Sequence, residues 1–254
     1  MGKAQLLKLP RKFPLPEQTP PVIALAGNPN TGKSTIFNLL TGLKQHTGNW
    51  PGKTVLLSSG SYYYQQQEYK LVDLPGTYSL LANSPDEESA RDFLCFARPQ
   101  ATVVVADATC LERNLNLILQ VLEITSQMIV CVNLLDEAKR KHISLDLKAL
   151  EVELGVPVVA TTASRGRGIN RLKEAIKDMA AGRTNVTPRR IIYDEEVEMA
   201  LQQIQFQMAE TLENCQIDRR FLALRLLDGD QTLIRKAADH KNLEDKVWAQ
   251  SLLK

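Results

Sequence analysis

The sequence predicts an α/β fold with a mostly parallel sheet and flanking helices, followed by a small all-helical domain. Three observations support this prediction. Between residues 21 and 183, short apolar runs alternate with amphipathic helical segments, as in strands joined by crossover helices. Two strands, 54–64 and 68–72, are separated only by a polar turn, which favours an antiparallel hairpin. From 190 to 254, apolar residues recur at helical spacing instead.

The other elements of the predicted 21–183 domain are assigned in the same way. Its remaining strands are expected at 22–26, 102–106, 128–132 and 158–161. Its helices are expected at 34–40, 112–125, 144–154 and 169–180. The segments expected to lack regular structure are a proline-rich basic arm (1–20), a glycine- and proline-containing loop (42–53) and a linker (183–190).

Composition excludes several classes of protein. The chain is 44% hydrophobic and 24% charged with a net charge of +2, and it has no concentrated basic stripe, so we expect no nucleic-acid partner. No apolar run approaches the ~18 residues of a membrane span, so this fragment is expected to be soluble. The four cysteines contain no CxxC pair and the three histidines no HExxH pair, which argues against a zinc site.

A phosphate-binding loop follows the first predicted strand. The sequence GNPNTGKS, which begins at Gly27, matches GxxxxGK[ST] in the strand–turn–helix context that the motif requires. Backbone amides at the helix start are expected to bind phosphate, Lys33 to contact the β- and γ-phosphates, and the Ser34 hydroxyl to hold Mg²⁺. The residues expected to bind nucleotide here are Gly27, Asn28, Pro29, Asn30, Thr31, Gly32, Lys33, Ser34 and Thr35.

Two further elements are expected to sense the γ-phosphate. The sequence DLPG matches DxxG, in which Asp73 reaches Mg²⁺ through water and the Gly76 amide contacts the γ-phosphate. Thr54, at the start of the hairpin, is expected to bring its hydroxyl to Mg²⁺ and its amide to the γ-phosphate. Thr77 stands where Ras-like enzymes carry a glutamine that orients the attacking water, so we expect slow intrinsic hydrolysis.

Guanine recognition is expected at the ends of the last two strands. The sequence NLLD matches NxxD, from Asn133 to Asp136, and a carboxylate there accepts both N1–H and the exocyclic amine of guanine. Leu134 replaces the lysine of the common NKxD pattern, so we expect weaker affinity and faster exchange with guanine preference unchanged. A loop of the SAK type, whose backbone amide donates to guanine O6, is expected at Thr162, Ala163 and Ser164.

Four ordered motifs at four strand ends predict a Ras-like P-loop GTPase fold, because ligands bind beyond the carboxyl ends of parallel strands. GTP and GDP are the expected ligands, Mg²⁺ the expected cofactor and GTP hydrolysis the expected reaction. Two alternatives stay open, a ribosome-assembly GTPase and a nucleotide-sensing module with negligible turnover. Acidic residues over 194–198 disfavour an RNA-binding domain.

The segments GNPNTGKST, HTGNWPGKTV, DLPGTYSL, VNLLDEAKR and SRGRGI together resemble the cytosolic region of the FeoB family of bacterial ferrous-iron transporters. The resemblance is strong over residues 22–180, and residues 190–254 resemble the family's GDP-dissociation-inhibitor-like helical domain by position and composition. It implies a nucleotide switch coupled to Fe²⁺ uptake, at the cytoplasmic side of the bacterial inner membrane, with the transmembrane part of the transporter as partner. The oligomeric state stays open, a homo-oligomer included.

The resemblance also implies K⁺ as an activator. Asn30 matches the asparagine that binds K⁺ in potassium-stimulated members, and backbone carbonyls around Gly48 and Trp50 would complete that site. Thr54 matches the switch threonine of the family. A cation beside the β–γ bridge supplies the charge that an arginine finger brings elsewhere. The residues expected to act in catalysis are therefore Lys33, Thr54 and Asn30.

Overall fold

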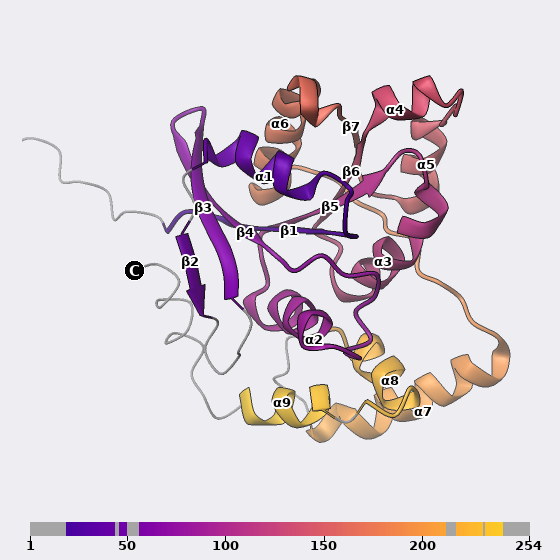
Figure 1. Ribbon diagram of the computed structural model, residues 1–254. Coiled ribbons are helices and arrows are strands. Elements are labelled where there is room, and N and C mark those ends of the chain that lie inside the picture. Colours follow the sequence, from indigo (N-terminus) through magenta and orange to yellow (C-terminus); the bar gives the residue numbers. More distant parts are fainter. Residues whose placement is uncertain (1–18, 44–45, 50–55, 212–216, 231, 241–254) are drawn as a thin grey trace, which may run out of the picture.

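The computed structural model describes residues 19–43, 46–49, 56–211, 217–230 and 232–240 (Figure 1). Within them, one seven-stranded sheet has the order β2-β3-β4-β1-β5-β6-β7. Its strands are β1 (Val22–Gly27), β2 (His46–Asn49), β3 (Leu56–Tyr64), β4 (Gln67–Asp73), β5 (Ala101–Asp107), β6 (Met128–Asn133) and β7 (Val158–Ala160).

The sheet is parallel from β4 to β7 and antiparallel at its other end. β1 pairs in parallel with both β4 and β5, and β6 pairs in parallel with both β5 and β7. β3 runs antiparallel to β4, as the predicted hairpin requires, and β2 extends it. The carboxyl ends of β1, β4, β6 and β7 therefore meet at one edge, which is where the four motifs were predicted.

Helices cover both faces of this sheet. They are α1 (Lys33–Thr41), α2 (Pro85–Asp92), a π-helix (Phe93–Ala97), α3 (Leu111–Ile124), α4 (Leu135–Arg140), α5 (Leu147–Leu154), a short 3₁₀ helix (Ala163–Arg165), α6 (Ile169–Ala180), α7 (Glu195–Thr211), α8 (Arg219–Leu227) and α9 (Thr232–His240). Among the described residues, no helix combines the length and the apolar character that crossing a membrane requires.

The alternation of side chains along the strands explains why two layers of helices form. Ile23 and Leu25 of β1 belong to the core shared with α1 and α6, whereas Ala24 and Ala26 face the core shared with α2, α3 and α5 (Figure 1). Successive side chains of a strand point to opposite faces, so a strand that is apolar at every position must be covered on both sides.

Some predicted boundaries were wrong. The loop predicted over 42–53 contains β2, a polar strand that forms by pairing with β3 rather than from its own pattern. The helix predicted from residue 144 begins at Leu147, because the Asp146 side chain accepts hydrogen bonds from the amides of Lys148 and Ala149 and caps it. Helices α2 and α4 were not predicted, since both are short and rich in charged side chains.

The C-terminal helices form a small core of their own that is continuous with the π-helix and α3. Met208, Phe221 and Leu233 come from α7, α8 and α9, and Cys95 of the π-helix packs among them. The helical domain therefore rests on the segment that follows the DLPG motif, as Figure 1 shows where α8 and α9 lie beside α2.

The segment that leads to the helical domain is fixed to the sheet domain. The amide of Thr187 donates to the carbonyl of Gly155 at 3.0 Å, and Arg189 forms an ion pair with Glu153. Gly155 has φ +67°, and a Cβ there would overlap the carbonyl oxygen of Thr187. Glycine is thus required both by the backbone conformation and by this close approach.

Replacing Gly155 with alanine is expected to destabilise the protein by about 2–4 kcal/mol, from the left-handed backbone and from displacement of Thr187. Gly182→Ala is the matched control, because Gly182 has φ +66° and nothing within 4 Å of the added Cβ. Urea denaturation measures the free energy of unfolding of both variants and of the wild type. Equal losses of stability would show that the contact with Thr187 contributes nothing.

Candidate nucleotide site

The first two motifs meet because β1 and β4 are neighbours. Leu25 of β1 is in register with Asp73 of β4, and Lys33, at the start of α1, donates from Nζ to Asp73 Oδ1. Lys33 is buried, and the Asp73 side chain is 17% exposed. Burial raises the pKa of the Asp73 carboxyl, and the neighbouring Lys33 charge opposes this shift. A cation and an anion are thus paired where the phosphates were predicted to bind.

The phosphate-binding loop presents an alternation of buried and exposed residues. Asn28 and Thr31 are buried, with the Thr31 hydroxyl donating to the carbonyl of Asn28 at 2.9 Å. Pro29 and Asn30 are exposed, and Asn30 has a left-handed backbone with φ +68°. Gly32 (φ +82°) lies so close to Asn133 that a Cβ would overlap its Nδ2 atom, so only glycine fits.

The remaining phosphate-side residues lie around this loop. Ser34 and Thr35 are exposed in the first turn of α1, and Gly76 lies beside Pro29, with 3.5 Å between a Cβ built on Gly76 and Pro29 Cα. Thr77, in the position of the missing glutamine, is buried with 6% of its surface exposed.

The predicted switch and K⁺ residues are only partly described. Gly48 belongs to β2 and is in register with Leu57 of β3. Trp50 and Thr54 lie outside the described residues, so their predicted contacts with Asn30 and with Mg²⁺ are not tested by the structure.

Asn133 connects three loops from a fully buried position at the end of β6. Its Nδ2 atom donates to the carbonyl of Thr31 in the phosphate-binding loop at 3.0 Å. Its Oδ1 atom accepts from the amide of Ala163 and from the hydroxyl of Thr161, each at 3.0 Å. The third and fourth motifs are therefore joined to the first by one side chain.

Asp136 lies in the first turn of α4 and presents two differently placed oxygens. Oδ1 is buried with no hydrogen-bond partner, whereas Oδ2 lies 3.5 Å from Nε of Arg165. Leu134, which precedes the helix, has a left-handed backbone with φ +61°. In the SAK-type loop, Thr162 and Ala163 are buried and Ser164 is exposed.

Two residues of this site had no predicted role. Thr161 precedes the fourth motif and fixes the Asn133 amide, and a threonine at the end of a buried strand gave no separate signal. Arg165 is part of the SRGRGI segment, but its pairing with Asp136 depends on how two loops approach one another.

Comparison with known proteins identifies the chain. A family model described as ferrous iron transport protein B matches residues 21–176, which is more than half of the sequence. This chain belongs to the FeoB family. A second model, described as the FeoB cytosolic helical domain, matches residues 193–251. The family's N-terminal region is a G domain, so the chain is a member of a GTPase family.

Relatives of known name agree with this identification. The Fe(2+) transporter FeoB of Salmonella typhimurium (strain LT2) is 41% identical over 212 residues, which are 82% of this chain and 27% of the relative. That of Escherichia coli (strain K12) is 39% identical over the same length. The chain therefore spans about a quarter of the length of the curated relatives that it matches.

Solved structures of the family share the fold. The cytosolic domain of the T. maritima FeoB iron transporter in its apo form has a TM-score of 0.79 at 36% identity, covering 87% of this chain and 86% of that one. The same domain in its GMPPNP form has a TM-score of 0.76 at 37% identity, covering 86% and 85%. The cytosolic domain of L. pneumophila FeoB has a TM-score of 0.77 at 32% identity, covering 85% and 84%.

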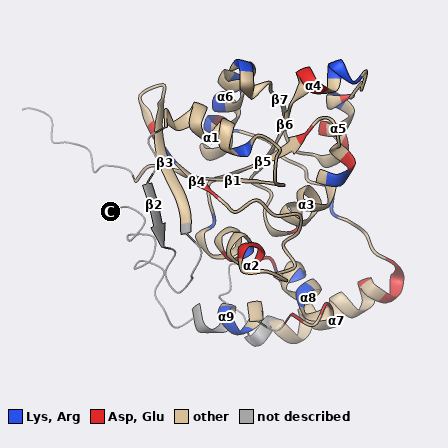
Figure 2. Cartoon of the chain, viewed as in Figure 1, with Lys and Arg blue, Asp and Glu red and all other residues tan. Residues whose placement is uncertain are grey.

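The alternative of a ribosome-assembly GTPase required an RNA-binding module after the G domain. The FeoB helical-domain model occupies that part of the chain instead. Its first helix, α7, begins with Glu195, Glu196 and Glu198, drawn in red in Figure 2, and carboxylates repel the phosphates of RNA. The family assignment therefore replaces this alternative.

Asn133→Ala is expected to reduce the free energy of unfolding by about 3 kcal/mol, because it leaves the Thr31 carbonyl and the Ala163 amide buried without their partner. Urea denaturation measures the loss, and titration with fluorescent GDP measures the accompanying fall in affinity. Asn170→Ala, at an exposed position of α6, is the control and should leave both quantities unchanged. If the two variants had the same free energy of unfolding and the same affinity for GDP, the connecting role of Asn133 would be contradicted.

Proposed function

We propose that this chain binds GTP with Mg²⁺ and hydrolyses it slowly, as the cytosolic nucleotide switch of a ferrous-iron transporter. Its place in such a transporter is the cytoplasmic side of the bacterial inner membrane, with the transmembrane part of the same protein as partner. The solved T. maritima domains with GDP and with GMPPNP support guanine nucleotides as ligands.

The buried, unpartnered Oδ1 of Asp136 is the observation on which the nucleotide assignment rests. A carboxylate oxygen shielded from water needs a donor, and leaving it without one is costly. Guanine offers N1–H and an amine side by side, which satisfies both oxygens of one carboxylate, whereas adenine offers an acceptor at N1. Asp136 therefore provides the discrimination between guanine and adenine, and Asn133 holds the neighbouring loops in place.

On the phosphate side, the residues present fit Mg²⁺. The donors are the Ser34 hydroxyl and the Asp73 carboxylate, which are hard oxygen ligands, and Mg²⁺ in nucleotide sites takes few protein ligands beside water and phosphate oxygens. When bound, Mg²⁺ supplies charge that neutralises the β- and γ-phosphates. Lys33 then exchanges Asp73 for phosphate oxygens.

Slow hydrolysis is proposed from the identity and burial of Thr77. This side chain is too short to orient a water molecule over the γ-phosphate, and it points into the protein. An additional positive charge near the β–γ bridge therefore becomes important. Asn30, exposed at the top of the phosphate-binding loop, is the proposed K⁺ ligand, with backbone carbonyls of Gly48 and Trp50 completing the site and Thr54 closing over the γ-phosphate.

GTP hydrolysis in KCl is expected to be at least about tenfold faster than in NaCl at equal ionic strength, which corresponds to about 1.4 kcal/mol of barrier. Asn30→Ala should abolish the difference, and Asn170→Ala, at an exposed site on α6, should retain it. The rate of phosphate release is measured under single-turnover conditions. Hydrolysis that is indifferent to the cation would remove Asn30 from the mechanism. Absence of turnover in both salts would favour the nucleotide-sensing alternative.

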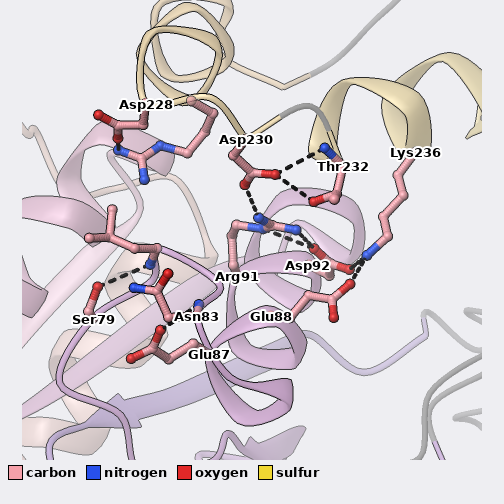
Figure 3. A network of polar contacts seen from close by, with 12 residues as sticks. Ser79, Asn83, Glu87, Glu88, Arg91, Asp92, Asp228, Asp230, Thr232 and Lys236 are labelled. Atoms are coloured by element: carbon pink, nitrogen blue, oxygen red, sulfur yellow. Dashed lines mark hydrogen bonds and ion pairs between the residues drawn. The ribbon is translucent and has the colours of Figure 1, made fainter.

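Coupling to the rest of a transporter is proposed to pass through α2. Figure 3 shows the polar contacts between this helix and the helical domain. Arg91, fully buried, donates to Asp92 and to Asp230 in the connection between α8 and α9. Lys236 of α9 in turn donates to Glu88 and Asp92 of α2. The Arg91 and Asp92 side chains are buried, and buried charges are stable only while they stay paired, so these contacts favour one arrangement of the two domains.

The segment that joins the DLPG motif to α2 is held in place by α3. Gln120 Oε1 accepts from the amide of Leu80 at 2.6 Å, and Asn116 Nδ2 donates to the carbonyl of Tyr78 at 3.1 Å. Both contacted residues lie in the segment between the DLPG motif and α2. A change at Asp73 or Gly76 that moves this segment therefore acts on α2 and on the helical domain.

Asp230→Asn is expected to speed GDP release about fivefold, because coupling energies between linked sites are of the order of 1 kcal/mol. The substitution keeps the size of the side chain but removes the charge that faces Arg91. Glu153→Gln is the control, since Glu153 pairs with Arg189 at an exposed site. Release of fluorescent GDP is followed after mixing with excess unlabelled GDP. Equal rates for all three proteins would exclude this route of coupling.

A further inference from the structure

Arg165 lies at the tip of a short closed loop. The amide of Thr162 donates to the carbonyl of Arg167 at 3.0 Å, and the amide of Arg167 donates back to Thr162 at 3.2 Å. Between them, Ala163 to Arg165 form one turn of 3₁₀ helix. The tip therefore has a defined backbone, and the Arg165 side chain extends from it toward α4.

This side chain reaches the guanine-recognition carboxylate from outside. Arg165 Nε lies 3.5 Å from Asp136 Oδ2, and the two side chains are 60% and 22% exposed. The other oxygen, Oδ1, is buried and unpartnered. The arginine thus occupies the solvent side of the carboxylate and leaves the inner oxygen directed into the site.

Beside Asp136, the chain lacks the lysine of the common NKxD pattern. Leu134 stands where the common NKxD pattern has a lysine, and it takes a left-handed backbone conformation immediately before α4. A positive charge beside Asp136 comes from Arg165, in the loop that follows β7. The two loops that are expected to surround the base are consequently joined twice, by Asn133 Oδ1 to the Ala163 amide and by Asp136 to Arg165.

We propose that Arg165 is a positioning residue for guanine recognition, which holds Asp136 in the orientation that receives the base and slows release of the nucleotide. Each carboxylate oxygen has two lone pairs, so Oδ2 accepts from the base and from Arg165 together. Because the arginine is largely exposed, its effect is modest and is screened by salt. The proposal rests on the proposed function, since it assumes that guanine binds at Asp136.

The first test compares release of fluorescent GDP from the wild type with release from Arg165→Ala and Arg165→Lys. Arg165→Ala should accelerate release about two- to fivefold at low ionic strength, and the difference should shrink at high salt. Arg165→Lys should restore part of the wild-type rate. Arg140→Ala is the matched control, because Arg140 is exposed on the same helix and its ion pair is with Glu137 rather than with Asp136, and it should release GDP at the wild-type rate.

A double-mutant cycle separates an action through Asp136 from any other role. In an Asp136→Asn background the site should accept xanthosine diphosphate, since xanthine has a carbonyl in place of the amine and an amide can donate to it. Removing Arg165 from that background should leave the release rate of xanthosine diphosphate unchanged, because the carboxylate that it positions is gone.

Four results would overturn the proposal. Slower release from Arg165→Ala would mean that the arginine competes with guanine for Asp136. Unchanged release, or acceleration equal to that of Arg140→Ala, would mean that the ion pair has no specific effect. The same acceleration in the Asp136→Asn background would place the action of Arg165 elsewhere. A wild type that does not prefer GDP to ADP would instead contradict the proposed function itself, and the inference with it.

Discussion

Asn133 holds three loops together from a position at the end of β6 that solvent does not reach. One side-chain amide donates to the phosphate-binding loop and accepts from the loop after β7, so neither loop can move far without leaving a polar atom unpartnered in the interior. The spacing of strands in the parallel part of the sheet makes this possible, because β1, β5, β6 and β7 end at the same edge. The geometry of the candidate site follows from the hydrogen bonds of Asn133 and from the common edge at which these strands end.

A second constraint acts on the face of the sheet that α2 and α3 cover. The Arg91 guanidinium is surrounded by protein and must keep its carboxylate partners, which come from α2 itself and from the helical domain. Cys95 adds an apolar contact by packing into the core of that domain. The segment after the DLPG motif therefore carries both a polar and an apolar attachment to the C-terminal helices, which is more than a flexible linker between independent domains would provide.

The sequence allowed the motifs and their strands to be predicted, because each motif places special side chains directly after a short apolar run. It did not reveal the pairing of Arg91 with Asp230, since the partners are 139 positions apart and a charged helix is usually assigned to the surface. β2 was missed for a related reason. Its residues are polar and lack alternation, so the strand exists only because β3 offers an open edge. The contact of Arg165 with Asp136 likewise depends on the approach of two loops.

The order of strands separates two parts of the site in space. β3, which precedes the DLPG strand, and β7, which leads to the guanine loop, are five strand spacings apart in the sheet, or about 24 Å at the usual 4.8 Å per strand. In the proposed function, the segments that respond to the γ-phosphate and the loop that reads the base thus lie toward opposite ends of one stiff sheet. A substitution in the guanine loop can therefore change how long the protein retains a nucleotide without replacing any residue that responds to the γ-phosphate.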